Sequence, residues 1–187
     1  MRLFTAIELP DDARTAIAAV QTAVASGPGG ASRALRLVRA EHVHLTLVFI
    51  GAVPEVRAAP IIEAMSADIA QAPFRIVFGG VGVFPPDGAP RVLWLGVLDG
   101  ARAAIDLQAR VAGRLRDAGL DVEQRPYRPH LTLARWRDAR PRERLAPTAS
   151  PGAVAAVDVS AVALLQSRLS SAGPSYTRLA QARLVCP

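Results

Sequence analysis

The chain has 187 residues, with 22 basic and 16 acidic side chains and a formal net charge of +6, so it can form one domain or two small coupled lobes. Every basic residue is Arg and none is Lys, which excludes a P-loop, a Schiff-base enzyme and a ligase that carries nucleotide on Lys. The single cysteine, Cys186, excludes an intramolecular disulfide framework and suits a reducing cytoplasm.

The first half of the chain alternates strand signals with helix signals. Pro10 followed by two aspartates is typical of a helix start, because proline is tolerated in the first turn and carboxylates favour the positive end of the helix dipole. Ile61, Met65 and Ile69 recur at helical spacing. We therefore expect a strand at residues 2–8, a helix at 13–25, a strand at 43–50 and a helix at about 55–71.

The second half repeats this alternation. A turn at Pro85-Pro86-Asp87-Gly88 predicts a hairpin of strands at residues 74–84 and 91–98. We then expect a helix at 101–118, a strand at 129–136, a loop at 138–150, and strands at 153–168 and 176–185. Helices and hairpin-linked strands together indicate an α+β fold rather than a doubly wound parallel sheet.

No segment has the composition of a membrane span or a signal peptide. The start lacks a basic stretch, an apolar run and a small-residue cleavage site. Apolar runs are broken by charge or proline before the roughly 20 residues that a membrane helix needs. We expect a cytoplasmic protein with no membrane association and no obligate protein partner.

One short string occurs twice, as His44-Leu45-Thr46-Leu47 and His130-Leu131-Thr132-Leu133, and it holds two of the three histidines. Each copy lies in a predicted strand, where side chains alternate between faces. The leucines can therefore face a core while the His and Thr of each copy face the other way. If the two halves pack about an approximate twofold axis, both polar faces meet across one cleft.

Two imidazoles on opposite sides of one phosphorus can perform in-line displacement without a metal or cofactor. One removes a proton from the attacking oxygen and the other delivers a proton to the leaving oxygen. The hydroxyls of Thr46 and Thr132 could donate to the non-bridging phosphoryl oxygens. We expect phosphodiester cleavage or its reverse, and the sequence alone leaves open which imidazole is the acid.

The charge pattern favours an anionic substrate. Residues 125–144 contain seven Arg and two acids, so most of the excess positive charge lies beside His130. Arg128 precedes His130 by two residues, as His42 precedes His44, which predicts a phosphate contact at that position. Tyr127 and Trp136 are interleaved with these arginines and are candidates for base stacking.

These residues resemble the 2H phosphoesterase superfamily, which is named for its two His-x-Thr-x motifs. Within it, the chain is similar to the bacterial and archaeal RNA 2′,3′-cyclic phosphodiesterases, historically called 2′-5′ RNA ligases. The resemblance covers nearly the whole chain and includes Arg2–Ile7, His42–Gly51, Tyr127–Arg135, Ser167–Leu169 and Gly173–Tyr176.

The resemblance implies a duplicated, two-lobed α+β fold in which antiparallel sheets with outer helices enclose a central cleft, as a single domain of residues 1–187. It implies hydrolysis of RNA 2′,3′-cyclic phosphate ends, tRNA fragments among them, to 2′-phosphomonoesters, and reversible ATP-independent 2′-5′ joining. It implies no cofactor and no metal. The implied site consists of His44 as proton donor, His130 as proton acceptor, and Thr46, Thr132, Arg128 and Arg135 as phosphate contacts.

Two alternatives remain at this point. His42, His44 and His130 could form a three-histidine zinc site with an open position for water. Alternatively, the arginines and aromatic residues could form a non-catalytic RNA-binding module, whose binding would survive the loss of either motif histidine.

Overall fold

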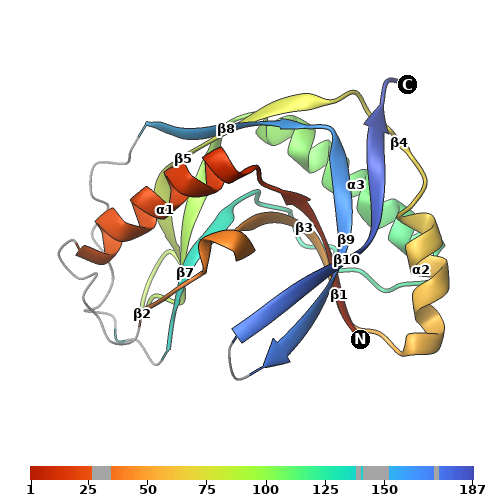
Figure 1. Cartoon of the computed structure of the whole chain (residues 1–187), viewed down its shortest axis with the longest axis horizontal. Coiled ribbons are helices and arrows are strands. Elements are labelled where there is room, and N and C mark those ends of the chain that lie inside the picture. Colours follow the sequence, from red (N-terminus) through yellow and green to blue (C-terminus); the bar gives the residue numbers. More distant parts are fainter. Residues whose placement is uncertain (27–34, 138–139, 141–151, 171–172) are drawn as a thin grey trace.

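The computed structural model describes residues 1–26, 35–137, 140, 152–170 and 173–187. Two curled sheets form the centre of the described part of the chain (Figure 1). The first sheet is antiparallel except for its last pair, in which β4 runs parallel to β10. Its strands, in spatial order, are β3 (His44–Ala52), β1 (Arg2–Glu8), β9 (Ala161–Ser170), β10 (Gly173–Val185) and β4 (Ile69–Ala70).

The second sheet is antiparallel at every described pairing. It contains the predicted hairpin at its centre and the second motif beside it. Its strands, in spatial order, are β2 (Leu35–Leu37), β7 (Leu131–Trp136), β6 (Val92–Asp99), β5 (Phe74–Phe84) and β8 (Ala153–Val159).

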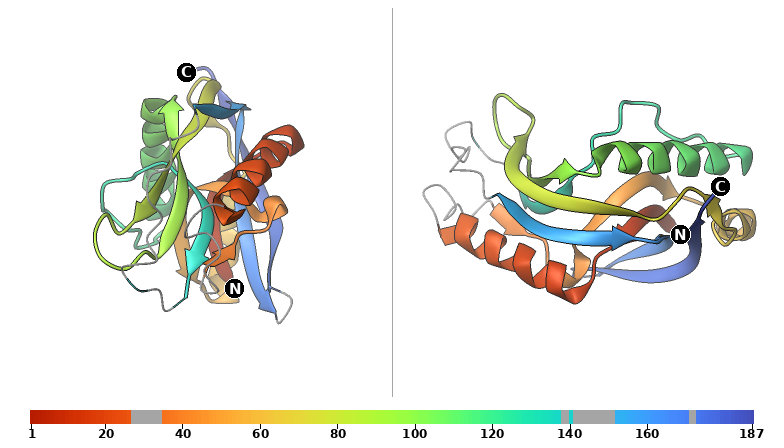
Figure 2. Two further views of the ribbon diagram at one scale, coloured as in Figure 1. Left: turned by 90° about the vertical axis from the view of Figure 1, so that its left-hand side faces the viewer. Right: turned by 90° about the horizontal axis from the view of Figure 1, so that it is seen from above.

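Helices cover the outside of this pair of sheets. Figure 2 shows α1 (Asp11–Ser26) and α3 (Ala101–Asp117) on opposite sides of the molecule with the strands between them. α1 contacts β8, and α3 contacts β3 and β5. The expected two-lobed α+β fold, with antiparallel sheets and outer helices, is confirmed.

The apolar faces of both motif strands pack in the core. Leu45, Leu131 and Leu133 have no exposed surface, and Leu47 is 3% exposed. His44, Thr46, His130 and Thr132 are each half-buried. The alternation predicted from strand geometry therefore holds in both copies, and the burial of four leucines fixes which face each His and Thr presents.

Two predicted elements are wrong in extent. The helix expected at 55–71 is a 3₁₀ turn, η2 (Glu55–Arg57), followed by a short α2 (Ala58–Ala64) and then β4. The strand expected at 153–168 is two strands that part at Ser160, so that β8 joins the second sheet and β9 the first. The loop expected at 138–150 falls outside the described residues except for Arg140.

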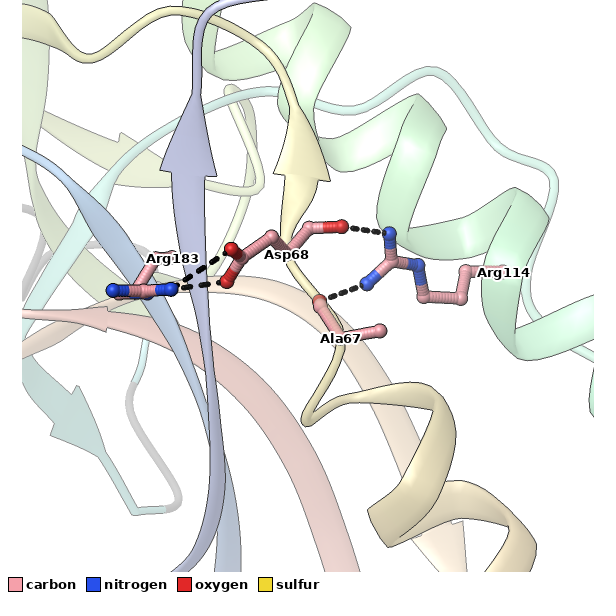
Figure 3. A network of polar contacts seen from close by, with 4 residues as sticks. All are labelled: Ala67, Asp68, Arg114 and Arg183. Atoms are coloured by element: carbon pink, nitrogen blue, oxygen red, sulfur yellow. Dashed lines mark hydrogen bonds and ion pairs between the residues drawn. The ribbon is translucent and has the colours of Figure 1, made fainter.

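A polar network fixes the segment that follows α2 (Figure 3). The Arg114 guanidinium of α3 donates to the carbonyl oxygens of Ala64, Ala67 and Asp68, which lie at and beyond the end of α2. The Asp68 carboxylate in turn accepts two hydrogen bonds from Arg183 of β10, at 3.2 and 3.0 Å. The network thus holds the segment after α2 between α3 and β10, and it gives the terminal carbonyl of α2, that of Ala64, a side-chain donor.

The helices of the described segments are too short or too polar to cross a membrane.

Candidate active site

A cavity of about 180 Å³ lies where the two sheets meet. The first sheet contributes His44 and Thr46 from β3, and the second contributes Thr132 and Arg135 from β7. The structure thus brings four of the predicted site residues from both halves of the chain into one small volume. The remaining lining consists of Phe4, Val38, His42, Phe49, Ser167 and Tyr176.

The two motif histidines are held in the same way. Nδ1 of His44 lies 2.7 Å from the carbonyl oxygen of His42, and Nδ1 of His130 lies 2.7 Å from the carbonyl oxygen of Arg128. A carbonyl can only accept, so each Nδ1 carries the proton and donates. Each neutral ring therefore has its lone pair on Nε2, which is the atom left to exchange a proton with a ligand.

His44 lies in an aromatic environment. Its ring stacks on Phe4 at a centroid distance of 4.8 Å and meets the edge of Tyr176 at 5.4 Å. Burial lowers the pKa of His44 from 6.5 to about 4, and the positive charges of Arg135 and Arg14 act in the same direction. The free protein therefore holds His44 neutral at pH 7.

His130 has a more open environment. It immediately precedes β7, lies two residues before Thr132, and meets the edge of the Phe84 ring at 5.3 Å. It is not among the described residues that line the 180 Å³ cavity. The alternation of β7 nevertheless places its side chain on the same face as Thr132, which does line that cavity.

Arg128 and Tyr127 make contacts that the sequence did not predict. The Arg128 carbonyl contacts His130, while the exposed Arg128 side chain leaves its phosphate contact a prediction. The Tyr127 hydroxyl donates to the Thr46 carbonyl at 2.7 Å, and burial raises the pKa of Tyr127. The polar end of Tyr127 thus holds the motif strand, and its ring packs against the core.

Base stacking by Trp136 is contradicted. Its side chain is 7% exposed and belongs to the main hydrophobic core, so it has no face on which a base could stack. Two of the arginines that made the 125–144 segment basic, Arg142 and Arg144, lie outside the described residues.

Phe49 is a pocket residue that the alternation rule missed. Counting from Thr46 predicts Val48 on the pocket face, but Val48 is 5% exposed in the core and Phe49 is 53% exposed and lines the cavity. The β1–β3 pairing shifts register between Thr5 and Ala6, where Leu47 is the extra residue. Such a bulge turns the following side chains to the other face.

Phe4 and Tyr176 form a small second hydrophobic cluster under the site. Phe4 packs there with Ala6, Ala163 and Leu165, and Tyr176 lies against them. These residues come from β1, β9 and β10, which are distant in sequence, so no local pattern could have linked them to His44. His42 completes this wall, with its ring 4.9 Å from Tyr176, and it also lines a neighbouring cavity of about 410 Å³.

The zinc alternative lacks its ligand set. All three histidines are described, yet the described residues contain no group of three His, Cys, Asp or Glu side chains placed to hold a metal.

Comparison with known proteins agrees with this geometry. The sequence profile of the 2′-5′ RNA ligase superfamily matches residues 9–170. An RNA 2′,3′-cyclic phosphodiesterase of Geobacillus stearothermophilus is 33% identical over 95% of this chain, which spans only 55% of that protein. The RNA 2′,3′-cyclic phosphodiesterase of Archaeoglobus fulgidus is 32% identical over 96% of this chain and 98% of its own length.

Solved structures show the same architecture. The TT0787 protein of Thermus thermophilus superposes with a TM-score of 0.71 at 32% identity, covering 98% of this chain and 97% of its own. Escherichia coli LigT complexed with 3′-AMP gives a TM-score of 0.80 at 28% identity, covering 98% of both chains. On its sequence, its fold and its paired motifs, this chain belongs to the 2′-5′ RNA ligase superfamily.

Proposed function

We propose that this chain hydrolyses 2′,3′-cyclic phosphate ends of RNA to 2′-phosphomonoesters. The observation that carries the proposal is the matched pair of motifs. Their threonines line one cavity from two different sheets, and their histidines share one carbonyl-fixed tautomer. Relatives that are named RNA 2′,3′-cyclic phosphodiesterase support the same reaction.

In the proposed reaction, Nε2 of His130 accepts a proton from water as the water oxygen attacks phosphorus. The bond from phosphorus to the ribose 3′ oxygen breaks, and Nε2 of His44 gives that oxygen its proton. The phosphate stays on the 2′ oxygen. Run with a 5′-hydroxyl in place of water, the same steps would join two RNA ends through a 2′-5′ linkage without ATP.

The donor role requires that His44 be protonated in the complex. Burial keeps the ring neutral in the free protein at pH 7, but a bound phosphodiester brings a negative charge beside Nε2. A nearby opposite charge favours the protonated imidazole and raises its pKa. Substrate binding and protonation of His44 are therefore coupled.

The other pocket residues have roles that follow from their chemistry. Thr46 and Thr132 both line the cavity, and their hydroxyls would donate to the non-bridging oxygens. Arg135 supplies a positive charge on the same side of the cavity as Thr132. Phe49 is the exposed aromatic ring at this cavity, and we assign base stacking to it in place of Trp136.

We further propose that the substrates are RNA ends, tRNA fragments among them, that the protein meets in the cytoplasm. The positive charge of the chain suits a polyanionic partner.

The decisive experiment offers an oligoribonucleotide with a 2′,3′-cyclic phosphate end to wild type, His44→Ala and His130→Ala, each with and without a strong chelator. We expect turnover that resists the chelator, that either substitution lowers at least a hundredfold, and RNA affinity that both variants largely keep. Turnover abolished by the chelator would instead identify a metal hydrolase. Salt-sensitive RNA binding without turnover in wild type would identify a non-catalytic RNA-binding module.

A further inference from the structure

An aromatic surface extends from the second motif across its sheet. Thr132 of β7 lies directly opposite Trp94 of β6, and Trp94 lies opposite Gly82 of β5. Residues paired directly across antiparallel strands share a face. Trp94 is therefore on the face of the sheet that Thr132 presents to the cavity.

Glycines make room for the indole on this face. A Cβ added at Gly82 would overlap the Trp94 ring, and one at Gly96 would come within 3.1 Å of it. Packing thus explains Gly82 of β5, because the Trp94 ring lies over backbone that carries no side chain there. The indole N–H is buried, so the partly exposed remainder of the Trp94 side chain is apolar ring.

The surface is continuous with His130. The Phe84 ring lies 5.2 Å from Trp94 and 5.3 Å from His130. Trp94 and Phe84 are both half-buried, with part of each ring accessible. Together they form an aromatic platform, defined here as Trp94 and Phe84, on the side of the site that belongs to His130.

A second aromatic group borders the site on the side of His44, where Phe4, Tyr176 and Phe49 lie. In-line displacement places the attacking and leaving oxygens on opposite sides of phosphorus. Hydrolysis needs a nucleoside on only one of those sides, because water occupies the other. Aromatic surfaces on both sides fit a reaction in which a nucleoside lies on each.

Resting on the proposed function, we infer that the aromatic platform binds the nucleoside whose 5′ oxygen is exchanged at phosphorus. In the joining direction, the 5′-hydroxyl gives its proton to His130 and its oxygen bonds to phosphorus. The bond to the 3′ oxygen breaks, and that oxygen takes the proton of His44. The product is a 2′-5′ phosphodiester with no water gained or lost, and the reverse steps cleave such a linkage.

The first test measures binding directly. The chain has two tryptophans, so Trp136→Phe leaves Trp94 as the only indole reporter. In a His44→Ala background that prevents turnover, 2′-5′-linked diadenosine monophosphate should quench this fluorescence saturably. The one-nucleoside ligand 2′,3′-cyclic AMP should quench it little. Equal quenching by both ligands, or none by either, would overturn the inference.

The second test compares two rates in each variant: cleavage of 2′-5′-linked diadenosine monophosphate and hydrolysis of 2′,3′-cyclic AMP. Trp94→Leu should lower the ratio of cleavage to hydrolysis about tenfold or more, as expected for one lost stacking partner. Trp94→Phe should largely restore it, and Trp136→Phe should leave it as in wild type. Phe84→Leu provides an independent variant should Trp94→Leu fail to fold, and it should lower the same ratio.

The outcomes separate this inference from the proposed function. A wild-type protein that hydrolyses 2′,3′-cyclic AMP but neither cleaves nor forms a 2′-5′ linkage would overturn the inference alone. So would an unchanged ratio in Trp94→Leu. A wild-type protein that hydrolyses no cyclic phosphate would overturn the proposed function, and the fluorescence titration would still decide whether the platform binds a nucleoside.

Discussion

The hydroxyl of Tyr127 donates a hydrogen bond of 2.7 Å to the carbonyl oxygen of Thr46. Tyr127 lies three residues before His130, and Thr46 belongs to the first motif on the other sheet. One partly buried contact thus links the segment that leads into the second motif to the strand of the first. We therefore expect the relative placement of the two motifs to depend on this bond. Errors of about 1 Å in such placement reduce rates strongly.

Tyr127→Phe tests that dependence. We expect kcat for 2′,3′-cyclic AMP to fall at least tenfold, while the free energy of unfolding falls by only about 1 kcal/mol for one lost hydrogen bond. Kinetics and urea unfolding of the same preparation measure both quantities. Arg114→Ala is the matched control, because it removes the distant bonds to Ala64, Ala67 and Asp68 and should cost stability without lowering kcat. Equal kcat in Tyr127→Phe and wild type would contradict the positioning role.

The titration of His44 is a second prediction. In the free protein its imidazole should titrate near the pKa of about 4 that burial against Phe4 and Tyr176 imposes. Inorganic phosphate should raise that pKa, because an anion in the pocket favours the protonated ring. Two-dimensional NMR of the imidazole nitrogens follows both titrations, and Phe4→Ala should move the free value toward 6.5. A His44 pKa that phosphate leaves in place would refute the coupling between substrate binding and the donor role.

The same shift makes folding stability depend on pH. His44 has a pKa of about 4 when folded and 6.5 as its ordinary value, so between these values the unfolded chain binds more protons. The free energy of unfolding is therefore unaffected by this group above pH 6.5. It decreases as pH falls from 6.5 toward 4, by about 3 kcal/mol at most. Urea unfolding from pH 7 to pH 4 measures it. His44→Gln, which does not titrate, should flatten this part of the curve, and an equally steep curve in that variant would assign the effect to other groups.

The sequence predicted the parts of this molecule that depend on local spacing. Alternation in the two motifs placed Leu45 and Leu131 in the core and the His and Thr side chains on the opposite face, and the structure agrees. The hairpin of β5 and β6 was similarly predicted from its turn and its apolar runs. Each of these features is determined by residues within one strand or across one turn.

The features that were missed depend on contacts between distant segments. The break at Ser160 occurs because the chain leaves one sheet for the other there, and a serine in a largely apolar stretch does not by itself mark that change. Similarly, the register shift that turns Phe49 into the pocket depends on the pairing of β3 with β1. The aromatic cage of His44 combines Phe4 and Tyr176 from opposite ends of the chain, so only the assembled sheet reveals it.

Phe49 carries the last prediction. Phe49 is 53% exposed and lines the pocket. The Arg2 guanidinium lies 5.1 Å from the centroid of its ring, so the ring is already held in place for stacking. Phe49→Ala should raise KM for 2′,3′-cyclic AMP about fivefold or more, consistent with a base-stacking contribution of about 1–3 kcal/mol, and should lower kcat less. Phe49→Tyr keeps the aromatic face and should keep KM.

Steady-state kinetics on the cyclic nucleotide provide both constants, and cyclic ribose phosphate without a base serves as the control substrate. Because that substrate has nothing to stack, Phe49→Ala should leave its KM at the wild-type value, and an equal rise for both substrates would show that Phe49 shapes the phosphate pocket instead of binding the base.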